Sequence, residues 1–94
     1  MPVKVEVYTS PTCPYCPYAT RLIHELAPPF GDNLTVEEID TWSPEGEKRA
    51  IKYNIMAVPT IVINGKVKFV GVPKKEDLEK AIREELKERT QHEA

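Results

Sequence analysis

The sequence has only two cysteines among its 94 residues, Cys13 and Cys16. It contains no hydrophobic run that approaches the roughly 20 residues of a membrane span. The segment from Met1 to Val5 does not begin an apolar run of the length that a secretion signal requires. The formal net charge of -2 at pH 7 argues against nucleic acid as a main partner. These absences predict a cytoplasmic protein that binds neither membranes nor nucleic acids.

What the chain does contain is sufficient for one small globular domain. Hydrophobic residues make up 40% of the sequence and charged residues 30%, a balance typical of soluble proteins. A chain of this length has room for one core. We expect residues 1–94 to form a single domain, with residues 90–94 as a frayed tail because they lack an apolar anchor. The lack of an exposed apolar stripe predicts a monomer.

Hydrophobic periodicity predicts four strands and three helices. The strands are expected at residues 3–8, 34–39, 60–63 and 67–70, and the helices at residues 14–27, 44–53 and 74–89. Two right-handed crossovers would make the first three strands parallel. Asn64-Gly65 predicts a hairpin that adds one antiparallel strand. The expected fold is α/β, a four-stranded mixed sheet of three parallel strands and one antiparallel strand, flanked by three helices on both faces.

The two cysteines lie where the first strand gives way to the first helix. If that helix begins at Pro14, both thiols lie on one face within disulfide reach, and unpaired amides at the helix start stabilise a thiolate on Cys13. Cys13 is then the attacking sulfur, and Cys16 resolves the mixed disulfide. Pro17 is a difficulty, because it cannot donate a hydrogen bond within such a helix.

Two other interpretations of the cysteine pair remain open. The thiols could be inert core residues, although a helix start flanked by prolines is an unusual place for them. They could also bind a metal or a glutathione-bridged iron–sulfur cluster. Zinc requires about four ligands and the chain has only this pair, so a metal site would need a second chain or borrowed ligands. We therefore predict no resident metal and no cofactor beyond the redox-active disulfide, with glutathione as a possible partner.

Three features in order resemble the thioredoxin and glutaredoxin superfamily. These are Cys13-Pro14-Tyr15-Cys16 after the first strand, Val58-Pro59-Thr60 at the start of the third strand, and Gly71 after the fourth. The resemblance implies a thioredoxin fold and thiol–disulfide oxidoreductase activity, in the manner of a small glutaredoxin-like thioredoxin. It also implies that the bond before Pro59 is cis and that this proline faces the disulfide.

The same resemblance implies a substrate-binding surface around the cysteines. In the family, the backbone at the position of Val58 pairs with an extended substrate. The residues expected to contact substrate are Thr12, Pro14, Tyr15, Val58, Pro59 and Gly71. Trp42 follows the second strand at the same end of the sheet as Cys13, and is either a docking contact or a packing residue.

The two halves of the chain favour different subfamilies. Cys-Pro-Tyr-Cys is the signature of dithiol glutaredoxins, but the residues that hold glutathione in those proteins are replaced here by Gly71-Val72-Pro73. The second half resembles thioredoxin, although the family's buried aspartate falls at about Val7. Without that acid, water or Glu6 would have to deprotonate Cys16. The leading hypothesis is a protein disulfide reductase that receives electrons from a thioredoxin reductase-type donor, and the alternative is a glutathione-dependent glutaredoxin.

Overall fold

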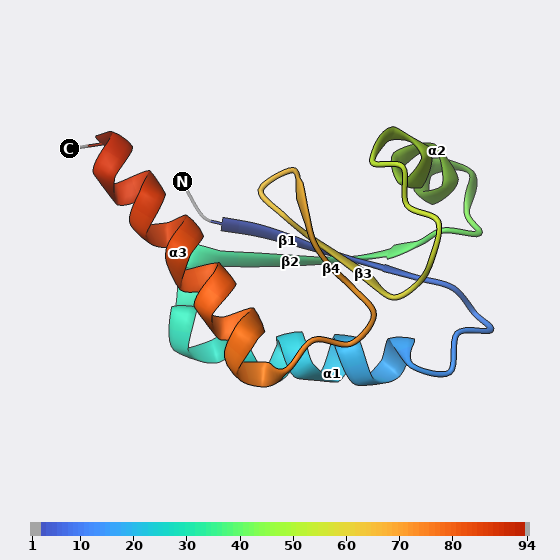
Figure 1. Ribbon diagram of the computed structural model, residues 1–94, viewed down its shortest axis with the longest axis horizontal. Coiled ribbons are helices and arrows are strands. Elements are labelled where there is room, and N and C mark those ends of the chain that lie inside the picture. Colours follow the sequence, from blue (N-terminus) through green and yellow to red (C-terminus); the bar gives the residue numbers. More distant parts are fainter. Residues whose placement is uncertain (1–2, 94) are drawn as a thin grey trace.

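Four strands and three α-helices follow one another in the computed structural model, which describes residues 3–93 and the side chains of residues 3–87 (Figure 1). In chain order the elements are β1 (Val3–Thr9), α1 (Cys16–Leu26), the 3-10 helix η1 (Pro28–Asn33), β2 (Leu34–Asp40), α2 (Pro44–Lys52), β3 (Thr60–Ile63), β4 (Lys66–Val70) and α3 (Lys75–Glu93). The predicted βαβαββα order is confirmed, and η1 is an addition to it.

The sheet has the order β2-β1-β3-β4, with β1 and β2 parallel and both pairs that involve β3 antiparallel. The expectation that the first three strands are parallel is therefore wrong for β3. The reason is α2, whose nine residues span only about 13 Å and which lies across the strands instead of returning along them (Figure 1). The chain consequently enters β3 at the end of the sheet where β1 ends.

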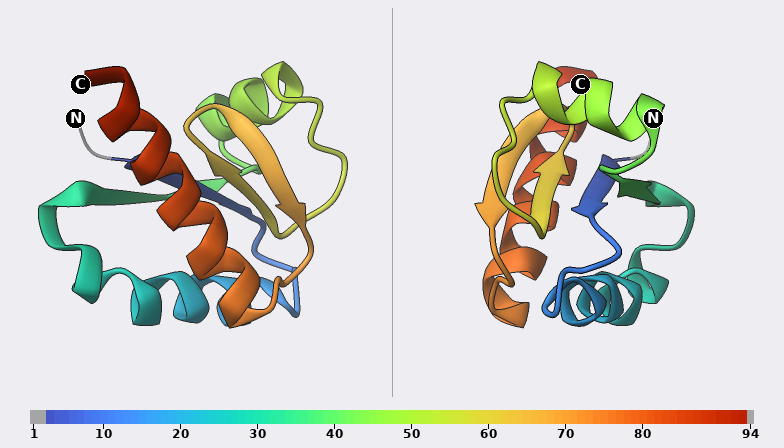
Figure 2. Two further views of the ribbon diagram at one scale, coloured as in Figure 1. Left: turned by 60° about the vertical axis from the view of Figure 1, so that its left-hand side comes forward. Right: turned by 90° about the vertical axis from the view of Figure 1, so that its right-hand side faces the viewer.

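Helices cover both faces of the sheet, as expected (Figure 2). On one face, α1 and α3 pack against inward side chains of β1 and β3 in the larger core cluster. On the other face, α2 packs through Ala50 against Tyr8, Ile39 and Val62. The central strand β1 is therefore buried on both sides, and Glu6 is buried along with its apolar neighbours.

The helix α2 begins as its sequence predicts. The Ser43 hydroxyl accepts a hydrogen bond from the Gly46 amide at 3.0 Å, Pro44 occupies the first turn, and Asn54 takes a left-handed conformation with φ 57° beyond the last turn. Gly46 has a packing role that its helix propensity does not suggest. A Cβ atom at this position would overlap the main-chain carbonyl of Asp40, so only glycine allows α2 to approach the end of β2 this closely.

The hairpin between β3 and β4 turns at Asn64 and Gly65, which both have positive φ, as the predicted Asn-Gly turn requires. The helix α3 then crosses the sheet, and its backbone is helical through Glu93. The expected fraying of residues 90–94 stays a prediction, because their side chains and the whole of Ala94 lie outside the described part. No helix in residues 3–93 is long and apolar enough to span a membrane.

Candidate active site

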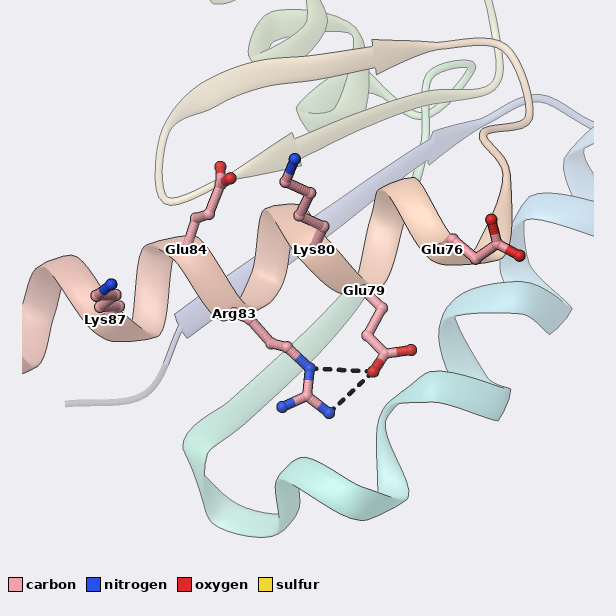
Figure 3. Close-up of a pocket in the computed structure, with 6 residues that line it drawn as sticks. All are labelled: Glu76, Glu79, Lys80, Arg83, Glu84 and Lys87. Atoms are coloured by element: carbon pink, nitrogen blue, oxygen red, sulfur yellow. Dashed lines mark hydrogen bonds and ion pairs between the residues drawn. The ribbon is translucent and has the colours of Figure 1, made fainter.

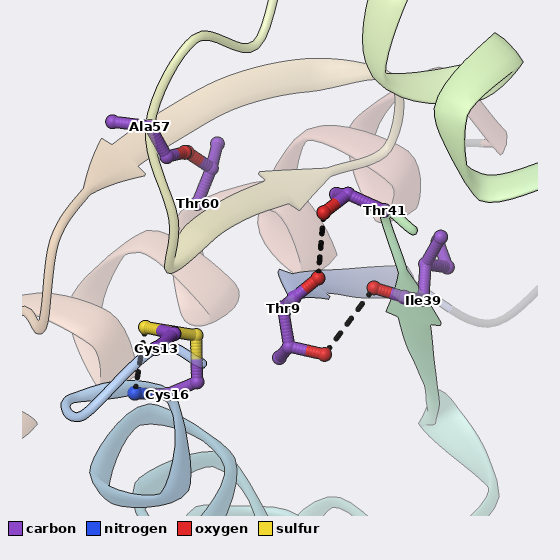
Figure 4. The surroundings of a disulfide bond; sticks show 7 residues. All are labelled: Thr9, Cys13, Cys16, Ile39, Thr41, Ala57 and Thr60. Atoms are coloured by element: carbon purple, nitrogen blue, oxygen red, sulfur yellow. Dashed lines mark hydrogen bonds between the residues drawn. A yellow bond between two sulfur atoms is a disulfide. The ribbon is translucent and has the colours of Figure 1, made fainter. Parts of the chain in front are cut away.

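Cys13, in the segment between β1 and α1, forms a disulfide with Cys16, the first residue of α1 (Figure 4). The helix begins at Cys16 with Tyr15 as its N-cap, so the expectation of a helix starting at Pro14 is wrong. Pro17 gives the physical reason. It occupies the first turn of α1, where an amide hydrogen is not needed, whereas in a longer helix it would leave the carbonyl of Cys13 without a donor.

The two sulfurs have different environments. The backbone amide of Cys16 donates a hydrogen bond to the Cys13 sulfur, with a nitrogen–sulfur distance of 3.1 Å. Cys13 is half-buried, whereas Cys16 is only 4% exposed. The amide of Cys16 at the start of the helix therefore reaches the Cys13 sulfur, although Cys13 lies before the helix and does not cap it. Stabilisation of a Cys13 thiolate stays a prediction. A partner approaching from solvent meets Cys13 first.

The peptide bond between Val58 and Pro59 is cis, as the resemblance implied. Pro59 is buried, and its carbonyl accepts a hydrogen bond from the Gly71 amide at 2.7 Å. Thr60, the next residue, pairs with Tyr8 near the end of β1. Thr12, which directly precedes Cys13, follows Tyr8 by four residues in the sequence. Figure 4 shows Ala57 and Thr60 in the surroundings of the disulfide. The three sequence features therefore lie at one end of the sheet.

Glu6 lies on the opposite side of the sheet from α1. The suggestion that Glu6 deprotonates Cys16 is therefore wrong. Its register partners are Glu37 and Val62, and Val62 belongs to the core under α2. The Glu6 carboxylate accepts a hydrogen bond from the Tyr8 hydroxyl at 2.8 Å and forms a close ion pair with Arg49. Glu6 is thus fully occupied by other side chains, and Val7, at the family's aspartate position, is buried in the apolar core.

Three groups with clearly shifted pKa values, Tyr8, Glu37 and Arg49, belong to this same cluster. Burial, and then the hydrogen bond to Glu6, raise the pKa of Tyr8 well above its ordinary value. Arg49 donates to Glu37 at 2.8 and 3.2 Å, which lowers the pKa of Glu37 to about 2 and raises the pKa of Arg49. We interpret the cluster as a fixed ionic contact between α2 and the sheet.

Exposed aromatic residues lie beside the disulfide. Tyr15 is 64% exposed and Tyr18 is 59% exposed, with ring centroids 6.4 Å apart. Tyr18 lies in α1 but not on its buried face, which is formed by Ala19, Ile23 and Leu26. Residues three apart share a helix face, so Tyr18 follows Tyr15 outward once the helix begins at Cys16. Thr12 and Pro14 are exposed as well.

Trp42 is exposed and lines a cavity of about 180 Å³ together with Val58 and Ser10. The Ser10 carbonyl accepts a hydrogen bond from the Cys13 amide, so this cavity adjoins the disulfide loop. Met56 also lines the cavity and is 91% exposed. Sequence reasoning missed Met56, because it lies in the segment between α2 and β3, where no periodicity separates inward from outward residues.

A larger cavity, about 450 Å³, lies along α3 and is unrelated to the disulfide (Figure 3). All of its lining residues come from α3: Glu76, Glu79, Lys80, Arg83, Glu84 and Lys87. Glu79 and Arg83, one helical turn apart, form an ion pair with nitrogen–oxygen distances of 2.8 and 3.0 Å. Charged side chains of this kind, spaced along one face, form a solvated helix surface.

Comparison with known proteins agrees with this geometry. Residues 3–83 match the family model described as "Thioredoxin domain". The chain belongs to the thioredoxin family. It is 50% identical over 86 residues to a probable thioredoxin of Methanothermobacter thermautotrophicus, a match that covers 92% of this chain and 99% of the relative. It is 50% identical over 84 residues to a thioredoxin of Methanocaldococcus jannaschii, covering 89% of this chain and 96% of the relative.

Solved structures show the same fold at low sequence identity. Thioredoxin-2, a component of the malaria parasite protein secretion machinery, superimposes with a TM-score of 0.76 at 20% identity, covering 88% of this chain and 82% of that one. Chloroplastic thioredoxin z gives a TM-score of 0.74 at 18% identity, covering 88% of this chain and 77% of that one. The predicted thioredoxin fold is confirmed.

The family and the bonded cysteine pair together define the activity class. This thioredoxin-family chain is a thiol–disulfide oxidoreductase, and membership of the family implies protein disulfides as substrates and a reductase as electron donor. The roles of individual residues are not fixed by these comparisons. Among the side chains of residues 3–87, no three His, Cys, Asp or Glu gather into a possible metal site. The predicted lack of a metal or other cofactor stays a prediction.

Proposed function

We propose that this protein reduces disulfides in cytoplasmic proteins, with Cys13 as the nucleophile and Cys16 as the resolving thiol. The observation that carries the assignment is the asymmetry of the pair. The Cys13 sulfur is the more accessible one and accepts a hydrogen bond from the Cys16 amide, whereas Cys16 is buried. A hydrogen bond from an amide favours a sulfur that carries negative charge, so Cys13 is the better thiolate.

The reaction proceeds by two exchanges. In the reduced protein, the Cys13 thiolate attacks one sulfur of the substrate disulfide, and the other substrate sulfur leaves as a thiolate and takes up a proton. The Cys16 thiol then loses its proton and attacks Cys13 in the mixed disulfide. That step releases the second substrate thiol and forms the Cys13–Cys16 disulfide. Two electrons pass from the protein to the substrate in each cycle.

The backbone around Pro59 supports a strand-like contact with the substrate. Val58 is half-buried, its peptide group leads into the cis bond, and the Pro59 carbonyl is occupied by Gly71. An extended substrate segment would pair with Val58, while Thr12, Pro14 and Tyr15 contact the same segment from the cysteine loop. This arrangement recognises main chain, which suits an enzyme with many protein substrates.

A thioredoxin reductase-type donor is the proposed source of electrons. The relatives at 50% identity carry the name thioredoxin, and Val72-Pro73 replaces the residues that hold glutathione in the glutaredoxins that this chain resembles. The Cys-Pro-Tyr-Cys sequence favours glutathione instead, and glutathione is therefore the second candidate donor. We also propose that the protein functions as a monomer without a metal or other cofactor.

Two cysteine variants test the assigned roles. Cys13→Ser should lose insulin disulfide reduction, because no accessible nucleophile remains. Cys16→Ser should attack once and then stay joined to its substrate, so a covalent adduct should be visible by mass spectrometry and disappear with dithiothreitol. Wild-type activity in Cys13→Ser would overturn the assignment. An adduct formed by Cys13→Ser but not by Cys16→Ser would reverse the two roles.

A further inference from the structure

We propose that Met56 is a site of oxidative modification, and that conversion of its thioether to a sulfoxide by a hydroperoxide slows the reduction of polypeptide disulfides by this protein. Hydrogen peroxide transfers one oxygen atom to the Met56 sulfur and leaves as water, so the sulfur is oxidised and the peroxide is reduced. The inference rests on the proposed function, because the affected step is the encounter with a polypeptide whose disulfide Cys13 attacks.

The side chain of Met56 is open to solvent. It is 91% exposed, more than any other exposed large hydrophobic side chain in the described part of the chain. A thioether is oxidised where an oxidant can reach the sulfur, whereas a methionine in a core is shielded. The other methionine of the sequence, Met1, lies outside the described residues. Met56 is therefore the thioether that the folded structure presents to a dissolved oxidant.

Met56 lies beside the disulfide site. It lines the cavity of about 180 Å³ that Trp42 and Val58 also line, and it stands two residues before Val58, whose peptide group leads into the cis bond. Ala57, the next residue after Met56, is drawn in the surroundings of the disulfide in Figure 4. A polypeptide that pairs with Val58 therefore passes over the Met56 side chain.

Oxidation changes the chemistry of this contact. The thioether of Met56 is flexible and apolar, so covering it with a partner's side chain is favourable. A sulfoxide is polar and accepts hydrogen bonds from water. A polypeptide that covers the oxidised side chain has to remove this water, which costs free energy. The sulfoxide should therefore weaken binding of polypeptide substrates without touching the cysteines.

The cysteine pair responds to the same oxidant in a way that its own catalytic cycle reverses. Peroxide oxidises the Cys13 thiolate to a sulfenic acid and leaves as hydroxide, and the Cys16 thiol then displaces water and forms the Cys13–Cys16 disulfide. The electron donor reduces that disulfide in every cycle. Reversal of the Met56 sulfoxide requires a separate sulfoxide reductase. Exposure to peroxide should thus leave a lasting change at Met56 but not at the cysteine pair.

The test starts from the disulfide form, which is treated with hydrogen peroxide in the presence of a metal chelator and then freed of peroxide with catalase. Peptide mass spectrometry locates the added oxygen. The protein is next reduced with dithiothreitol, which is removed, and the rates of reduction of two substrates are measured. Insulin supplies polypeptide chains, whereas hydroxyethyl disulfide has no polypeptide that could lie over Met56.

Two variants accompany the wild type, and each protein is compared with its own untreated sample. Met56→Leu removes the thioether but keeps Met1, so it reports any effect of oxidation elsewhere in the chain. The double variant Met56→Leu/Ile51→Met moves the thioether to α2, because Ile51 is 70% exposed and does not line the cavity beside Trp42. Circular dichroism establishes that both variants, whose altered side chains are exposed, are folded.

In the wild type, peroxide should add one oxygen to Met56 and lower the rate of insulin reduction about fivefold. Reduction of hydroxyethyl disulfide should not change. Treated Met56→Leu should keep its untreated rates, and so should the double variant even though its thioether is oxidised. These results together would assign the effect to the thioether at position 56.

Three results would overturn the proposal. The first is a Met56 that stays unmodified under conditions that oxidise the thioether of the double variant. The second is a Met56 sulfoxide that leaves insulin reduction unchanged. The third is an equal loss of activity in treated Met56→Leu, or an equal loss with hydroxyethyl disulfide, since either would place the damage outside Met56.

The failure of this proposal and the failure of the proposed function give different results. If the untreated wild type reduces insulin and peroxide has no effect through Met56, only the modification proposal is lost. If the untreated, fully reduced wild type does not reduce insulin, the assignment as a protein disulfide reductase is lost, and the proposal for Met56 is lost with it.

Discussion

Thr60 stands opposite Tyr8 across the antiparallel pair of β1 and β3. This register places Pro59 at the end of the sheet where the chain leaves β1 for the cysteine loop. If β3 had run parallel to β1, Pro59 would have entered the sheet at the far end, away from Cys13. The direction of β3 is thus the feature of the fold that assembles the disulfide, the cis bond and Gly71 into one site.

Replacement of Glu6 by glutamine should leave the pH dependence of disulfide resolution unchanged. Glu6 contacts Tyr8 and Arg49 on the α2 side of the sheet and does not face the cysteines. The measurement is the rate at which the mixed disulfide resolves as a function of pH, with Glu38→Gln on the exposed part of β2 as the control. A shifted profile in Glu6→Gln alone would mean that this carboxylate does exchange protons with Cys16.

Removal of the Arg49 charge should destabilise the protein. Arg49→Met leaves the buried Glu6 carboxylate without its cation, and breaking a buried pair in this way costs about 3 kcal/mol. Arg83→Met, which breaks an exposed pair with Glu79, should cost less than about 1 kcal/mol. Urea unfolding of the two variants gives both values. Equal losses would show that the Arg49 contact is no more than a surface ion pair.

Low pH should decrease the free energy of unfolding, partly because Glu37 becomes protonated. Arg49 lowers the pKa of Glu37 from 4.5 to about 2, so the stabilisation is fully present above pH 4.5 and is lost as the pH falls through 2. The effect should be small, because 41% of the Glu37 side chain is exposed to solvent. Glu37→Gln should therefore lose less stability between these pH values than the wild type or the exposed-residue control Glu25→Gln. An equally steep loss in Glu37→Gln would contradict this.

Gly46→Ala separates helix propensity from packing. Propensity alone predicts that alanine stabilises the helix by about 1 kcal/mol. The close approach of α2 to the Asp40 carbonyl predicts the opposite, a loss of about 1–3 kcal/mol, because the added Cβ has no room. Thermal or urea unfolding decides the sign. The exposed Lys48→Ala in the same helix serves as the control and should change stability by less than about 0.5 kcal/mol.

The elements of the fold could be predicted because their signals are local. The apolar spacing of Ala19, Ile23 and Leu26, the cap at Ser43 and the turn at Asn64 each depend on neighbouring residues only. The direction of β3 could not be predicted in this way. It depends on whether α2 runs along the sheet or across it, and residues 53–59, which decide the return path, have no periodicity.

Part of the site could be predicted from the sequence for the same reason. Cys13, Cys16, Pro59 and Gly71 belong to short motifs, and the structure brings them to one end of the sheet. The start of α1 was placed too early, although Pro17 carried the information that the helix begins later. Met56 has no motif and no periodic neighbours, and only the folded chain shows it beside Val58.

The most direct test of the account is a comparison of electron donors. The oxidised protein is incubated with glutathione in one reaction and with NADPH and a thioredoxin reductase in another, and the Cys13–Cys16 state is followed by thiol alkylation. The account predicts rapid reduction by the reductase and slow reduction by glutathione. Rapid reduction by glutathione alone would contradict it, and would mean that Cys-Pro-Tyr-Cys determines the donor and that the protein works as a glutaredoxin.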